Sequence, residues 1–161
     1  MVIVYTLPLA ASLCHLFEEF VWPGGFRDWY RDYRPEIAES VTNGFLVRIN
    51  ALMVAVGIWV AWAGPMGASY LSAWLILSTI LMNNAIFHIH AVLSTRRYSP
   101  GVVTGTVLYL PLFFAGVPHI WLQGYVQTST VIVSVGLGML YQSWSLFNHR
   151  RRARAARSRA D

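Results

Sequence analysis

Two long stretches of this chain contain no Asp, Glu, Lys or Arg, and they limit its fold more than any other feature. The first covers the 47 residues between Arg48 and Arg96, and the second covers the 52 residues between Arg97 and Arg150. The hydrocarbon core of a bilayer is about 30 Å thick, so about 20 helical residues cross it. Each stretch therefore has room for two membrane-spanning helices joined by a short turn.

The composition excludes an ordinary water-soluble domain. Hydrophobic residues make up 56% of the 161 residues and charged residues only 12%, about half the charged share of a typical soluble domain. Lipid offers no partner for backbone polar groups, so the apolar segments must be helices or a closed barrel. Five segments are too few and too long for a barrel. The sequence predicts an all-α, polytopic membrane helical bundle.

The apolar runs predict five spans within one transmembrane domain, residues 1–149. The predicted spans are residues 2–21, 44–63, 70–94, 102–122 and 127–148. The segment 22–43 alternates charged and aromatic residues and is expected to lie at the cytoplasmic interface. Residues 150–161 are predicted to form a basic cytoplasmic tail.

The arginines predict the orientation of these spans. All 12 basic residues are Arg, and they lie in the first connection and the entry to the second span, in the third connection, and in the tail. The Gly64–Gly67 turn, the Gln123–Tyr125 turn and the N-terminus have none. The positive-inside rule therefore places the N-terminus outside and the C-terminus in the cytoplasm. The tail favours contact with anionic lipid over nucleic acid, because no aromatic stacking partners are interleaved with its arginines.

Glu18 and Glu19 are the only acidic residues within a predicted span, where a carboxylate is costly unless it is paired, protonated or faces a cavity. His15 precedes them by three and four residues, so the three side chains lie near one stripe of the helix. This compact polar cluster is the first candidate for a functional site.

A second polar cluster lies in the third predicted span, where Asn84 and His88 are four residues apart and share a face. His15 lies seven residues before Trp22, and His88 lies seven residues before Thr95. Each of these residues marks the predicted cytoplasmic end of its span, so both histidines are expected about 10 Å below one interface. We therefore expect His15 and His88 to lie close together.

Three motifs together resemble one family. His15-x-x-Glu18-Glu19, Asn84-x-x-x-His88 and Arg97-Tyr98-Ser99-Pro100-Gly101 resemble the HXXEE-domain family of small bacterial integral membrane proteins. The resemblance extends from the first helix to the fourth span. The resemblance implies a membrane-embedded enzyme and leaves its reaction open. It also implies a multi-pass protein of the bacterial inner membrane.

The first functional hypothesis is a metal-assisted enzyme. His15, His88 and one carboxylate would supply the three protein ligands of a catalytic zinc site, with the fourth position left for water. Glu19 is the favoured ligand because its angular offset from His15 is smaller than that of Glu18, which would then be the general base. Asn84 and Tyr98 are expected to contact either the metal-ligating side chains or the substrate. Zinc is favoured over iron, and two glutamates are too few for a two-metal centre.

Two other hypotheses remain open. One is a metal-free acid–base isomerase or cyclase of an isoprenoid-like substrate, in which one buried carboxyl stays protonated as the acid. The other is a membrane subunit without enzymatic activity, or a proton-coupled transporter. In each enzymatic hypothesis the substrate is a hydrophobic or lipid-like small molecule, and no nucleic acid is expected. The sequence leaves a homo-oligomer open.

Overall fold

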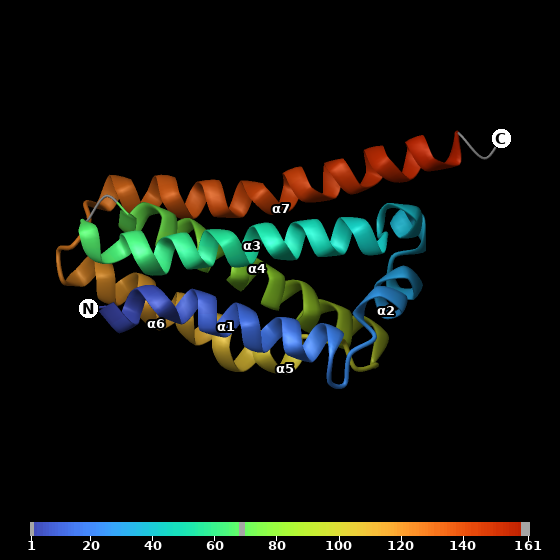
Figure 1. The fold of residues 1–161 in the computed structure, drawn as a ribbon, viewed down its shortest axis with the longest axis horizontal. Helices are drawn as coiled ribbons and strands as arrows, with labels where there is room; N and C mark the ends of the chain where they lie inside the picture. The colour runs from blue at the N-terminus through green and yellow to red at the C-terminus, as the bar shows by residue number, and fades with distance from the viewer. Residues whose placement is uncertain (1, 68–69, 159–161) are drawn as a thin grey trace.

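The computed structural model describes residues 2–67 and 70–158, and this part of the chain contains helices and no strand. Figure 1 shows long helices lying side by side and reversing direction from one to the next. The helices are α1 (Val2–Phe20), α2 (Phe26–Tyr33), η1 (Pro35–Ser40), α3 (Asn43–Ala63), η2 (Gly64–Met66), α4 (Leu71–Thr95), α5 (Val102–Thr104), η4 (Gly105–Tyr109), α6 (Leu110–Leu122) and α7 (Thr128–Arg157). The all-α prediction is confirmed.

Four helical segments are long and apolar enough to cross a membrane. They are Asn43–Met66, Leu71–Thr95, Val102–Leu122 and Thr128–Arg157. α1 is not among them, although it runs beside α3 (Figure 1). The count of five spans therefore stays a prediction.

α4 is the central helix of the bundle. It contacts α1, α3, α6 and α7, and half of its spanning window is buried, against 11–28% of the other three. Trp74, Leu75 and Ala85 on α4 are fully buried, and the Trp74 indole donates to the carbonyl of Val4 on α1 at 2.9 Å. A side chain on α4, such as His88, is therefore held in the interior of the bundle.

The outer helices expose apolar side chains along much of their length. On α7, Ile132, Leu140 and Phe147 are 64–66% exposed, and on α3 Val47 and Trp62 are 67–68% exposed. A large continuous apolar surface is unfavourable in water and favourable in hydrocarbon. The exterior is therefore that of a membrane protein.

α7 continues beyond the last predicted span, which ends at residue 148, and through most of the predicted basic tail to Arg157. The span and tail boundaries stay predictions. Ala and Arg are strong helix formers, so the Arg/Ala segment extends the helix instead of breaking it. Arg157 then reaches Glu39 of η1 at 3.2 Å.

The fourth predicted span is a composite helix. α5, the π-helical turn η4 and α6 follow one another without a break from Val102 to Leu122. π-helical turns occur often at functional sites because they shift the register of the side chains around them. Here Thr104 and Tyr109, at either end of this turn, both contact His15.

Candidate functional site

Glu19 lies between two histidines inside the bundle. Its Oε1 atom is 3.3 Å from Nε2 of His15 on α1 and 3.3 Å from Nε2 of His88 on α4. The three residues are at most 5% exposed, and one ligand atom from each lies within 4.8 Å of the other two. The imidazole centroids are 5.2 Å apart. The predicted proximity of His15 and His88 is confirmed.

Each imidazole is held through its other nitrogen. His15 Nδ1 lies 2.8 Å from the hydroxyl of Thr104, and His88 Nδ1 lies 2.7 Å from the hydroxyl of Ser99. Ser99 precedes α5 and Thr104 ends it, so one short segment orients both rings. A hydrogen bond at the second nitrogen is also how proteins orient metal-ligating histidines.

The Glu18 carboxylate lies against the same segment and has four donors. Tyr98 Oη (2.6 Å) and the backbone N–H of Val103 (3.0 Å) donate to Oε1, and the backbone N–H of Thr104 (2.7 Å) and its hydroxyl donate to Oε2. These two N–H groups belong to the first turn of the composite helix, where a carboxylate is favourable. Glu18 therefore joins α1 to α5 and is not one of the residues that line the cavity.

These bonds determine which nitrogen of His15 carries the proton. The Thr104 hydroxyl has one hydrogen, which it donates to the Glu18 carboxylate, so its oxygen accepts from His15 Nδ1–H. In the neutral ring Nε2 then has a lone pair, and it faces a carboxylate oxygen at 3.3 Å. Neither His15 Nε2 nor His88 Nε2 has a hydrogen-bond partner, although both atoms are buried. A proton or a cation between His15 Nε2 and the Glu19 carboxylate would satisfy both atoms.

The cluster is covered tightly by the segment before α5 and by aromatic rings. A Cβ atom on Gly101 would lie 2.6 Å from His15 Cε1 and 3.0 Å from His88 Cε1, and its φ of +100° favours glycine. The Tyr109 ring lies 4.6 Å from the His15 ring, and Trp29 of α2 stacks on His88 at 5.7 Å. Water is thereby kept from most of the site.

A cavity of about 200 Å³ gives access to the cluster from one side. It lies between α1, α3, α4 and α7, and α2, η4 and the residues on either side of η1 also contribute to its wall. His15, Glu19 and Asn84 line its inner end, and the Oδ1 atom of Asn84 is buried without a hydrogen-bond partner. Asn84 thus presents a polar atom in the same cavity as Glu19.

The sequence prediction and the structure agree on where most of these residues lie. His15, Glu19 and His88 come together, Asn84 lines the adjoining cavity, and Tyr98 donates to Glu18. The general-base role predicted for Glu18 does not suit its geometry, because both of its oxygens are occupied by donors. Thr104 gave no signal in the sequence, because a hydroxyl in a helical first turn is common.

The fold and the site define a class of protein, a membrane-like helical bundle with a buried His/Glu cluster at its centre. The model of the family described as "Protein of unknown function with HXXEE motif" matches residues 6–116. The chain belongs to the HXXEE family, and the residues of its naming motif are His15, Glu18 and Glu19. No curated protein and no solved structure is significantly similar to the chain.

Proposed function

We propose that the protein is an enzyme of the bacterial inner membrane that uses a divalent metal bound by His15, Glu19 and His88. Zinc is the favoured ion. The observation that carries the proposal is the pair of 3.3 Å contacts between buried imidazole nitrogens and one carboxylate oxygen, without a hydrogen bond. Tetrahedral ligands about 2.0–2.1 Å from zinc are roughly 3.4 Å apart. The donor set and its spacing therefore fit the metal.

The chain supports this chemistry with its own groups. A zinc ion lowers the pKa of bound water to about 7, which supplies a nucleophile for hydrolysis or related water-activating reactions. Thr104 and Ser99 fix the two rings, and the Oδ1 atom of Asn84 can accept a hydrogen bond from a water molecule or a substrate. The mainly apolar cavity wall selects a hydrophobic or lipid-like substrate.

The first prediction concerns the metal itself. Tag-free protein is purified in a neutral detergent, stripped with a chelator, incubated with zinc and analysed by mass spectrometry for metal content. We expect one zinc per wild-type chain and a loss of zinc in His88→Ala and Glu19→Gln. His90→Ala is the matched control, because His90 lies on the same helix and bonds to Tyr33 outside the cluster.

Folding is checked by circular dichroism and gel filtration, since removing one member of a buried charged pair is costly. If a variant does not fold, X-ray absorption at the zinc edge of the wild-type protein still tests the ligand set, which should contain two imidazoles and no sulfur. Wild-type protein that binds zinc no better than His88→Ala rules out the metal site. The shared position would then hold a proton, as metal-free acid–base catalysis requires.

A further inference from the structure

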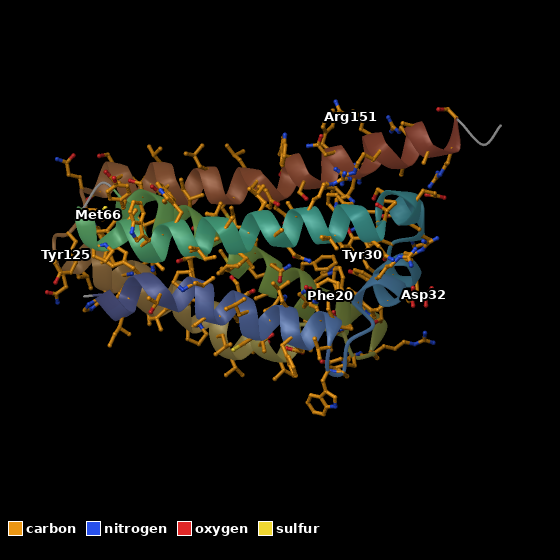
Figure 2. The ribbon with its side chains drawn as sticks, in the orientation of Figure 1. Phe20, Tyr30, Asp32, Met66, Tyr125 and Arg151 are labelled. Atoms are coloured by element: carbon orange, nitrogen blue, oxygen red, sulfur yellow. The ribbon has the colours of Figure 1, made fainter. Side chains whose placement is uncertain are left out.

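The cavity that Glu19 lines is also lined by residues from the arginine-rich end of the bundle. These residues include Tyr30 and Arg34 from the segment that connects α1 to α3, and His149 of α7. Figure 2 shows Tyr30 and Asp32 of α2 at the same end of the bundle as Arg151, while Met66 and Tyr125 lie at the other end. The side chain of Arg34 is 24% exposed, so this end of the cavity is within reach of water.

Arg34 is available to a ligand. Its Nε donates to Glu36, whose side chain is 50% exposed, and its terminal amino groups are left for another acceptor. Guanidinium groups bind carboxylates and phosphates through two parallel hydrogen bonds. Burial raises the pKa of the nearby Tyr30 phenol, which therefore stays a neutral hydrogen-bond donor at pH 7.

A second arginine adds positive charge behind the wall. The Arg152 guanidinium lies 4.0 Å from the centroid of the Phe45 ring, and Phe45 lines the cavity. The Nε atom of Arg152 is buried and has no hydrogen-bond partner. Uncompensated positive charge in a low dielectric attracts an anion more strongly than it does in water.

Most of the other residues that line the cavity are apolar, although Asn50, Gln142 and Ser145 also line it. The apolar side chains come from α1, α3 and α4 and from the residue that follows η1, and they include Leu16, Val41, Leu46, Ile49, Met53 and Leu81. Such a wall favours a hydrocarbon body over a polar one. Arg34 is the only arginine among the residues that line the cavity, so it is the lining side chain with which an anionic group would pair.

We propose that this cavity binds a small amphiphile, with a carboxylate or phosphate at Arg34 and an apolar body that extends toward Glu19. The proposal deepens the proposed function, because it names the class of substrate that would reach the His15–Glu19–His88 cluster. The volume of about 200 Å³ is below the roughly 300–1,000 Å³ of pockets for drug-sized ligands. The occupant is therefore a single short chain and not a complete phospholipid.

Binding is tested by isothermal titration calorimetry on the full chain in a neutral detergent. The probes are octyl phosphate, octanoate, octanol and octyltrimethylammonium, each below its own micelle concentration. We expect octyl phosphate and octanoate to bind at least about 10-fold more tightly than octanol, which is about 1.4 kcal/mol. Octyltrimethylammonium should not bind, and the relative strength of the phosphate and the carboxylate identifies the headgroup.

Three variants test the location of the ligand. Arg34→Gln should weaken binding of the two anionic probes about 10-fold or more and leave octanol binding unchanged, and Arg152→Gln should act in the same direction. Arg151→Gln is the matched control, because Arg151 is the exposed neighbour of Arg152 on α7. Ile49→Trp places a larger side chain in the cavity, which Ile49 lines, and should abolish binding of all the probes.

Equal affinity for octanol and octyl phosphate, or wild-type affinity in Arg34→Gln, overturns the proposal. Zinc content is measured in the same samples, which separates the two ideas. Loss of anion binding in Arg34→Gln with one zinc retained supports both proposals. Zinc binding without selective anion binding overturns only the amphiphile, and selective anion binding without zinc overturns only the metal.

Discussion

Glu18 and Glu19 are neighbours in the chain, yet their carboxylates meet different partners. Successive residues of a helix differ by about 100° in direction, so Glu19 faces His88 on α4 while Glu18 faces the first turn of α5. Glu18 accepts four hydrogen bonds, and Glu19 faces two imidazoles without a matching hydrogen bond. Donors therefore hold both oxygens of Glu18, whereas Glu19 faces the two imidazoles.

Thr104 is the residue that connects these two environments, and its hydroxyl can be removed with little change in shape. In Thr104→Val, His15 Nδ1–H loses its partner, at a cost of about 1–3 kcal/mol for an unsatisfied buried group, and Glu18 Oε2 keeps only the backbone N–H of Thr104 as a donor. We expect a lower melting temperature. We also expect zinc affinity to fall about 10–100-fold, because losing the hydrogen-bond partner of a metal-ligating histidine typically weakens metal binding by that factor. Calorimetry with zinc and thermal unfolding measure the two effects.

Thr104→Ser should restore both properties, since it keeps the hydroxyl. Thr106→Val serves as the control, because the Thr106 hydroxyl is exposed and bonds only to the carbonyl of Val102. A folded Thr104→Val protein with wild-type zinc affinity would show that Thr104 does not set the protonation of His15.

Among the elements, the short segment from Ser99 to Tyr109 contributes most to the site. It supplies the hydroxyls for both histidines, the backbone donors for Glu18, and the glycine that lets the chain pass over the two rings. The π-helical turn η4 then brings Tyr109 against His15. The site thus depends on how this segment docks between α1 and α4.

Gly101→Ala tests that docking. The new Cβ would lie 2.6 Å from His15 Cε1, in a backbone conformation that L-residues rarely adopt, so the segment or the ring must move. We expect a loss of stability of more than about 1 kcal/mol together with reduced zinc content, measured by thermal unfolding and metal analysis. Gly136→Ala on α7 is the matched control, because nothing lies within 4 Å of its added Cβ.

Gly101→Ala protein with wild-type stability and zinc content would mean that the segment does not cover the histidines as described. Reduced zinc in Gly136→Ala would instead indicate that any small change in the bundle disturbs the site.

In the whole molecule, the described arginines gather at one end of the bundle. They belong to α2, the start of α3, the end of α4, the end of α7 and the segments next to them, whereas the turns at Met66 and Tyr125 lie at the opposite end (Figures 1 and 2). The positive-inside rule infers the orientation of the spans from such an uneven distribution of arginines. It supports a cytoplasmic position for the arginine-rich end and for the charged end of the cavity.

Cysteine labelling tests this orientation in a Cys14→Ala background. A cysteine in place of Met66 should react with an impermeant reagent added outside, and a cysteine in place of Ala155 should react only after the membrane is opened. Both positions lie in described helices with exposed side chains. Labelling of residue 66 from the cytoplasmic side only, or of residue 155 from outside only, would reverse the topology.

The sequence by itself determined the helical class, the approximate positions of the long helices and the meeting of His15, Glu19 and His88. Each of these follows from local rules: apolar length, helical periodicity and equal distances from the ends of two helices. The sequence did not determine how far α7 would extend, because the change from apolar to basic residues marks a membrane boundary and not the end of a helix.

Only the tertiary structure decided the different surroundings of Glu18 and Glu19. Those surroundings depend on the docking of α5, 85 and 86 residues later in the chain, for which no periodicity exists. The same holds for the Thr104 and Ser99 hydroxyls and for the cavity that joins Glu19 to Arg34. These features arise from the packing of distant segments, which local sequence patterns do not encode.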